Sequence, residues 1–404
     1  MLDVSSLYCG SNQDGDSLRY GKSGDTDTPN SGQDRKPVVV FNITRDCNLR
    51  CVHCYSGSDR KHYPGQLETS TILSTLEDLA EFDVPAVLLS GGEPLVHRDF
   101  DPILKKTEEL GLRTTISTNG TLIDEERAVK LKESSLRYVG VSLDGIGDLN
   151  DDFRGLEGAF ERALDGIRNC KKVNQKVGLR MTLTSYNVGQ LDEVFDLLEE
   201  ENIDRVCFYH LAYAGRGKEI SNADLTDEER RSAVETILER TRQAHKQGNR
   251  LEVLTVANPV DNAYLYKKLL QDRPRRADQV KDLLEWNGGG LNSSGVGIAS
   301  IDFYGRVHPN QFWMSRTLGN IKNRPFSDIW TDESDGFLEN LRNRKPLLDE
   351  PCQSCEFLDL CGGGLRLRAE ASGNLWGRDP SCYLSQKERN DESYLEPDPS
   401  HLTG

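Results

Sequence analysis

The sequence lacks the long apolar runs that membrane-spanning helices need. Its 404 residues are 36% hydrophobic, and no apolar run approaches the roughly 20 residues that span a bilayer. The first residues, MLDVSSLYCGSNQDGD, contain neither the basic segment nor the apolar segment of a secretory signal. We therefore expect a cytoplasmic protein with no membrane partner.

Excess positive charge is also missing. The chain has 50 Lys and Arg against 66 Asp and Glu, a formal net charge of -16. Sequence-independent nucleic-acid binding needs a basic surface, so the composition argues against nucleic acid as a partner. At about 150 residues per domain, the length allows two or three domains, or one large barrel with an appendage.

Cysteine is the most informative residue type. The chain has 10 cysteines, and in a cytoplasmic protein disulfides explain them poorly. Most of them fall into two groups, at 47–54 and 352–382. Cys9, Cys170 and Cys207 stand alone, and we expect such lone cysteines to be small buried apolar residues.

Strand-like and helix-like segments alternate between residues 38 and 211. Such alternation predicts an α/β fold with a parallel sheet, either doubly wound or closed into an incomplete (β/α) barrel, with the chemistry at the carboxyl ends of the strands. The predicted strands are 38–44, 86–92, 113–120, 138–145, 177–184 and 205–211, and the predicted helices are 68–82, 99–111, 123–134, 157–173 and 189–201.

Changes in composition divide the chain into four segments. Residues 1–36 predict an irregular preamble rich in Ser, Gly, Asp and Asn. The barrel would occupy 37–221, and a charged, helical linker region would occupy 222–289. Residues 290–404 would form the last domain, and turn glycines with short strands predict a hairpin within 288–309.

The first cysteine group, CNLRCVHCY, has the spacing Cys47-x3-Cys51-x2-Cys54. Three thiolates can hold one face of a cubane iron–sulfur cluster and leave one iron open for a ligand. A structural zinc ion would need four ligands, and His53 could be the fourth. The spacing alone leaves both interpretations open.

This motif, with Tyr55 directly after it, resembles the signature of the radical S-adenosylmethionine (SAM) superfamily. The sequence SGGEP at 90–94 ends the next predicted strand and agrees with that resemblance. Glycines there let the backbone approach a ligand, and Glu93 supplies a carboxylate for an ammonium group. The resemblance implies a partial (β/α)6 barrel and reductive cleavage of SAM, with catalytic cluster ligands Cys47, Cys51 and Cys54.

The same resemblance implies contacts with the cofactor. Glu93 would bind the methionine amino group, and Arg154 would pair with the methionine carboxylate. Purely structural roles stay open, since Asn119 could form only a turn and Arg154 could only cap a helix. The implied cofactor-binding positions are Tyr55, Gly91, Gly92, Glu93, Asn119, Ser142, Asp144 and Arg154.

The second cysteine group has the spacing Cys352-x2-Cys355-x5-Cys361-x20-Cys382. Four thiolates suit a [4Fe–4S] cluster or a structural zinc ion. After a radical SAM domain, the group resembles a SPASM/twitch extension. The full SPASM pattern has more cysteines, whereas 288–351 contains none and Leu365 occupies another ligand position. We therefore expect two [4Fe–4S] clusters in all, one of them auxiliary and without a free iron.

Four stretches resemble the tetrapyrrole-modifying branch of this superfamily: DSLRYG at 16–21, the segment at 41–56, CFYHLAYAGRG at 207–217 and GIASIDFYGRVHPNQFW at 297–313. The likeness is greatest to 12,18-didecarboxysiroheme deacetylase of the alternative haem pathway. It implies removal of acetate groups to give Fe-coproporphyrin III, with an electron donor such as ferredoxin or flavodoxin. The haem d1 enzyme of the same branch is the alternative.

A tetrapyrrole carries carboxylates, which call for Arg or Tyr near the barrel mouth. Tyr213 and Arg216 fit that need, and His210 and His308 could ligate a substrate iron or move protons. A lone His is, however, more often packed or solvated. Two other functions remain open, a peptide-modifying SPASM enzyme and a non-catalytic iron–sulfur scaffold, and the second would not need Glu93.

Overall fold

The computed structural model describes residues 1–11 and 36–390. It divides into two compact units. We call residues 36–224 and 294–341 the barrel unit, and residues 1–35, 225–293 and 342–404 the cysteine-rich unit. These units divide the sequence differently from the four segments expected from composition, because 294–341 belongs with the barrel and 225–293 belongs with the second cysteine group.

Six parallel strands of the barrel unit lie beside one another in chain order. Strand β2 is buried along almost its whole length, as expected of a parallel strand covered on both faces. This confirms the predicted parallel sheet. The strands are β2 (Val38–Thr44), β3 (Val87–Gly91), β4 (Thr114–Thr118), β5 (Tyr138–Ser142), β6 (Val177–Leu183) and β7 (Arg205–His210).

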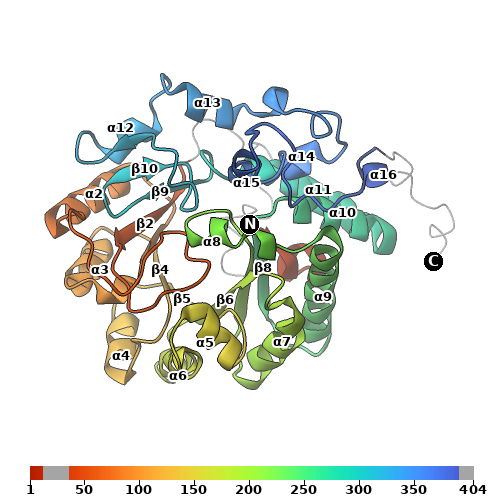
Figure 1. Ribbon diagram of the computed structural model, residues 1–404. Coiled ribbons are helices and arrows are strands. Elements are labelled where there is room, and N and C mark those ends of the chain that lie inside the picture. The colour runs from red at the N-terminus through yellow and green to blue at the C-terminus, as the bar shows by residue number, and fades with distance from the viewer. Residues whose placement is uncertain (12–35, 391–404) are drawn as a thin grey trace. The chain divides into compact units, whose positions relative to one another are not determined.

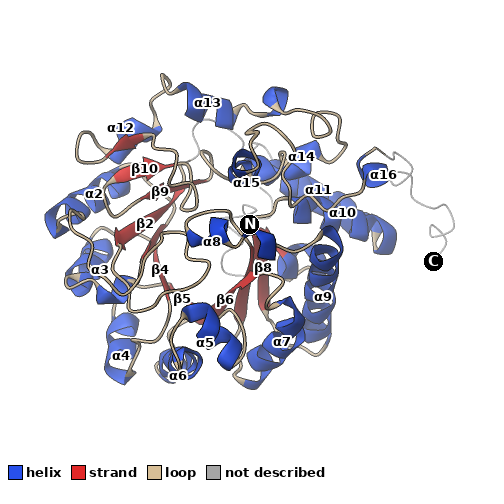
Figure 2. Cartoon of the chain, viewed as in Figure 1, coloured by secondary structure: helices blue, strands red, loops and turns tan. Residues whose placement is uncertain are grey.

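Amphipathic helices connect these strands and cover the outside of the sheet, while the strands lie inside (Figures 1 and 2). In α6, Phe160, Ala163 and Ile167 recur on one face and are buried. The short helix α5, which carries Arg154, was not predicted. The connecting helices are α2 (Thr69–Glu81), α3 (Phe100–Glu109), α4 (Glu125–Glu133), α5 (Asp148–Arg154), α6 (Ala159–Lys172) and α7 (Leu191–Glu200). The four-residue helix α8 (Arg216–Glu219) follows the last of these strands.

The predicted hairpin is confirmed as β9 (Ile298–Ile301) and β10 (Arg306–His308), which pair antiparallel. Strand β9 also pairs in parallel with β2 and so extends the barrel sheet. The side chain of Asn42 in β2 donates to Ser300 Oγ across this pairing, at 3.2 Å. The remaining elements of this unit are β11 (Gly319–Asn320), α12 (Phe326–Trp330) and α13 (Gly336–Arg342).

The cysteine-rich unit is mostly helical, and it contains regular segments that the sequence did not predict. Strand β8 (Glu252–Val256) interrupts the predicted helical region and pairs with β1 (Leu2–Asp3). Residues 5–9 form a buried π-helical turn instead of irregular chain; the rest of the preamble, including 16–21, lies outside the described residues. The helices are α9 (Asp227–Lys246), α10 (Val260–Asp272), α11 (Pro274–Asn287), α14 (Leu358–Cys361), α15 (Arg366–Ala371) and α16 (Gln386–Arg389).

Two of the lone cysteines, Cys170 and Cys207, are buried as expected, whereas Cys9 is half-buried. None of the helices in the described part of the chain is both long and apolar enough to cross a membrane.

Candidate active site

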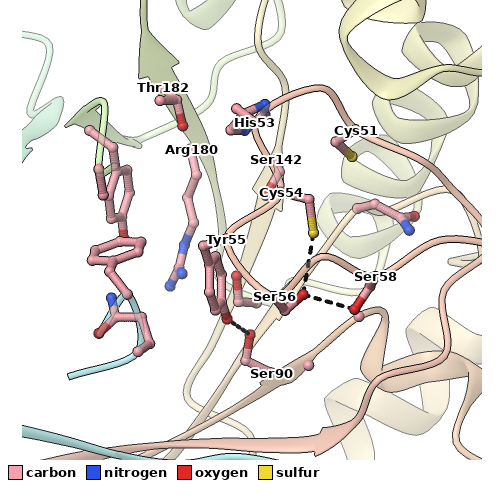
Figure 3. Close-up of a pocket in the computed structure, with 18 of the residues that line it drawn as sticks. Cys51, His53, Cys54, Tyr55, Ser56, Ser58, Ser90, Ser142, Arg180 and Thr182 are labelled. Atoms are coloured by element: carbon pink, nitrogen blue, oxygen red, sulfur yellow. Dashed lines mark hydrogen bonds between the residues drawn. The ribbon is translucent and has the colours of Figure 1, made fainter. Parts of the chain in front are cut away.

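The three cysteines of the first group, Cys47, Cys51 and Cys54, line one cavity at the carboxyl ends of the barrel strands (Figure 3). Each thiol has a hydrogen-bonding neighbour. The backbone N–H of Leu49 donates to Cys47 Sγ at 3.3 Å, and Ser56 Oγ lies 3.2 Å from Cys54 Sγ. Several predicted cofactor positions line the same cavity: Tyr55, Gly91, Gly92, Asn119, Ser142, Asp144 and Arg154.

Arg154 is committed to two partners in this wall. Its Nη2 atom lies 2.5 Å from Asp144 Oδ2 in a buried ion pair, and its Nη1 atom donates to Cys51 Sγ at 3.5 Å. The backbone N–H of Thr182 donates to the other Asp144 oxygen at 2.7 Å. These contacts tie α5 to the cysteine loop, and they make Arg154 more than a helix cap.

His53 lines the same cavity, and one of its two ring nitrogens is paired with a carboxylate. Its Nε2 atom lies 3.3 Å from Asp144 Oδ2, and burial lowers its pKa. Within the described residues, no three His, Cys, Asp or Glu side chains group around a single metal ion. A cubane spaces its thiolate ligands more widely than one zinc ion does, so three thiols around one open cavity fit a cluster better than a Cys3His zinc site.

Gly91 and Gly92 let the loop after β3 pack directly on the cysteine loop. A Cβ atom at Gly91 would lie 2.3 Å from the carbonyl oxygen of Thr44, and one at Gly92 would lie 2.3 Å from that of Asp46. The N–H of Gly92 donates to the Thr44 carbonyl at 2.7 Å. No other residue fits here without moving the backbone that leads to Cys47.

Glu93 lies behind this wall and not among the residues that line the cavity. Its carboxylate accepts hydrogen bonds from the N–H of Leu95 at 3.1 Å, the Thr118 hydroxyl at 2.7 Å and the N–H of Asn119 at 2.7 Å. Burial raises the pKa of Glu93 to about 7, although these three donors oppose the rise. The carboxylate therefore ties the end of β3 to the end of β4.

The second cysteine group lines a separate cavity in the cysteine-rich unit, formed in part by Cys352, Cys355, Cys361 and Cys382. Burial raises the pKa of the Cys361 thiol well above its usual value. Three glycines after Cys361 all have positive φ, at 62°, 82° and 80°, so the chain turns sharply beside the cavity. Four thiols around one cavity fit a complete ligand set for a cluster.

Comparisons with known proteins agree with this geometry. A model of the radical SAM superfamily matches residues 41–206, and one of an iron–sulfur cluster-binding domain, SPASM, matches residues 294–356. The Fe-coproporphyrin III synthase of Methanosarcina barkeri (strain Fusaro) is 50% identical over 395 residues, covering 96% of this chain and 98% of that protein. This chain belongs to the radical SAM superfamily.

One further relative and one solved structure are similar to this chain. The pre-heme d1 synthase of Dinoroseobacter shibae is 42% identical, over 87% of each chain. The solved structure of native anSMEcpe with bound AdoMet superposes with a TM-score of 0.68 at 20% identity, covering 89% of this chain and 96% of that one. At that identity the structure shows the fold alone, and it confirms the predicted partial barrel with a C-terminal extension.

The radical SAM domain implies SAM and a [4Fe–4S] cluster. The chain fits both groups, because the three thiols border a cavity whose other walls carry Ser142, Asn119 and the backbone of 91–92. The SPASM model describes a cluster-binding domain, and its match includes Cys352 and Cys355. These two cysteines line the second cavity together with Cys361 and Cys382, and the four thiols fit a cluster.

The four predicted substrate residues are not brought together. His210 lines the cavity, but Tyr213, Arg216 and His308 do not. Arg216 instead donates from Nε to the Cys51 carbonyl at 2.8 Å and from Nη2 to the Ser58 carbonyl at 2.7 Å, so it braces the cysteine loop. Tyr213 donates to Asp224 at 2.9 Å. His308 is fully buried, with Nδ1 2.8 Å from the Arg316 carbonyl.

Arg180 is a cavity residue that the sequence analysis missed. Its side chain runs from β6 into the cavity beside the ring of Tyr55 (Figure 3). Its Nε atom is buried and has no hydrogen-bond partner among the described residues. A charged residue inside a buried parallel strand is unusual, so the Arg in GLRMTLT was the available signal. Tyr209, Gln311 and Phe312 also line this cavity and were missed.

Proposed function

We propose that this radical SAM enzyme removes acetate side chains from 12,18-didecarboxysiroheme and forms Fe-coproporphyrin III. The observation that carries the proposal is the 50% identity, over nearly the whole length of both chains, to an Fe-coproporphyrin III synthase. Two [4Fe–4S] clusters, one on each cysteine group, and a low-potential donor such as ferredoxin or flavodoxin complete the proposal.

When bound, the first cluster and SAM supply the radical chemistry. Cys47, Cys51 and Cys54 would hold that cluster from one side of the cavity. The backbone of Gly91 and Gly92 lines the cavity where the methionine end of SAM would lie, and Ser142 and Asn119 line it where the rest of SAM would lie. The direct contacts implied for Glu93 and Arg154 remain predictions, since both side chains already have protein partners.

The cavity also suits a substrate with an apolar ring and carboxylates. Tyr209 and Phe312 supply aromatic edges, with ring centroids 6.5 Å apart. The guanidinium of Arg180 offers a fork that matches a carboxylate. His210 at the same wall would lie close to such a ring.

The test is anaerobic incubation of the reconstituted enzyme with SAM, dithionite and 12,18-didecarboxysiroheme, followed by mass spectrometry. We expect Fe-coproporphyrin III together with 5′-deoxyadenosine, and neither product from the Cys51→Ala variant. A haem d1-type product would favour the alternative represented by the pre-heme d1 synthase. No change in the tetrapyrrole, with modification of a peptide encoded nearby, would refute the proposal.

A further inference from the structure

Two buried arginines flank the second cysteine cavity, and neither forms an ion pair with any described residue. Arg366 is 1% exposed and Arg389 is 9% exposed. The Nε atom of each is buried and has no hydrogen-bond partner in the described part of the chain. A guanidinium that is removed from water without a counter-charge is costly. The described protein groups leave that cost unbalanced at both positions.

The partners that these arginines do have are uncharged. Arg366 donates from Nη1 to the carbonyls of Leu375 at 3.0 Å and Gly377 at 2.7 Å. Arg389 donates from Nη1 to the Leu384 carbonyl. Carbonyl oxygens fix where a guanidinium lies, but they do not cancel its charge.

The carboxylate that lines this cavity is already paired. Asp379 accepts two hydrogen bonds from Arg368, from Nε and from Nη2, each at 2.9 Å. Burial alone would raise the pKa of Asp379, but the charge of Arg368 lowers it below the usual value. Asp379 is therefore ion-paired with Arg368 and, although its charge also acts on Arg366, it forms no ion pair with that residue.

The cavity brings both arginines to the four thiols. Arg389 lines the cavity together with Cys352, Cys355, Cys361 and Cys382. Arg366 donates from Nη2 to the carbonyl of Gly363, which lines the same cavity two residues after Cys361. Thiolates that hold a cluster would supply the negative charge that both guanidinium groups lack.

We propose that Arg366 and Arg389 are the buried counter-cations of the auxiliary iron–sulfur cluster and raise its reduction potential. A cubane bound by four thiolates is negative overall, and one further electron makes it more negative. A nearby buried cation stabilises the reduced state more than the oxidised state. The inference rests on the proposed auxiliary cluster and does not depend on the identity of the substrate.

The test is a redox titration of the full-length protein in which Cys47, Cys51 and Cys54 are replaced by Ala, so that only the auxiliary cluster responds. After anaerobic reconstitution, the reduced cluster is followed by electron paramagnetic resonance as the potential is lowered with dithionite. Arg366→Met and Arg389→Met should each shift the midpoint to lower potential. The midpoint of Arg366→Lys should stay close to that of the starting protein, because Lys keeps the positive charge.

Arg275→Met is the matched control, because Arg275 is an exposed arginine of the same unit, and its midpoint should equal that of the starting protein. Unchanged midpoints in both cavity variants, with about four irons retained, would overturn the proposal. If Arg366→Met retains no iron, the midpoint of Arg389→Met decides alone. Absence of any cluster in the starting protein would defeat the auxiliary site itself, whereas a wild-type protein that holds this cluster but does not convert the tetrapyrrole would defeat only the proposed function.

Discussion

Glu93→Gln separates two roles for the most buried carboxylate of the active site. Glu93 has two acceptor oxygens, and they serve two backbone N–H groups and one hydroxyl. Gln has one acceptor oxygen, so in either orientation its amide group faces a backbone N–H, of Leu95 or of Asn119. One buried donor then loses its partner, which costs about 1–3 kcal/mol.

The assay compares stability with cofactor affinity. Because the pKa of Glu93 is raised from 4.5 to about 7, its ionisation lowers the stability of the folded protein as the pH rises through this range, and the neutral Gln lacks that loss. The free energy of unfolding of the SAM-free variant should therefore be lower than that of the wild type by about 1–3 kcal/mol at pH 4.5, and this deficit should shrink as the pH is raised to about 8.5. A direct contact with the methionine ammonium predicts the reverse pattern, unchanged stability with SAM binding weakened about ten-fold or more. Calorimetric titration with SAM and denaturant titration distinguish the two.

Thr118→Val is the matched control, since it removes the hydroxyl that donates to Oε1 of the same carboxylate. Its loss of stability should be smaller, about 0.5–1.5 kcal/mol, and should not add fully to that of Glu93→Gln because the two share a bond. Unchanged stability in both variants would refute the structural role.

Three further predictions concern the cavities. Reconstituted protein should hold about eight irons, and the variant with Ala at Cys47, Cys51 and Cys54 about four; stoichiometric zinc in the metal analysis would contradict both clusters. Arg216→Ala removes two hydrogen bonds to the cysteine loop, so it should lower iron retention at the first site, and normal iron content would count against this bracing role. Arg180→Met should weaken binding of Fe-coproporphyrin III about ten-fold in a spectral titration but not that of its methyl ester; equal losses for both would exclude a carboxylate contact.

Local patterns predicted the elements that carry the cysteines. Whether a segment forms a buried parallel strand depends mainly on its own residues and on those next to it in the sequence. The predicted strand at 38–44 therefore coincides with β2. The expected positions of Asn119 and Ser142 at the cavity follow from the same rule. The spacing of the four later cysteines likewise predicted one shared cavity.

Contacts between distant segments were not predictable in this way. Arg216 looks like a substrate residue in sequence because it follows a strand, yet its acceptors are the carbonyls of Cys51 and Ser58. The role of Glu93 depends on donors supplied by the next strand. Strand β8 was not predicted because it lies between charged helices. It pairs with β1, which is formed by residues at the N-terminus and therefore lies far away in the sequence.

The parallel pairing of β2 with β9 affects how the protein forms during synthesis. Val38–Phe41 pair with Ile298–Ile301, so this edge of β2 stays unpaired until most of the chain has been made. An exposed apolar edge is a site of aggregation. Asn42 also links Ser300 to Tyr55, which donates to Asn42 Oδ1 at 2.8 Å. The loop that carries the three cluster cysteines therefore reaches its final arrangement late, and iron delivery belongs after translation, when the hairpin has joined the sheet.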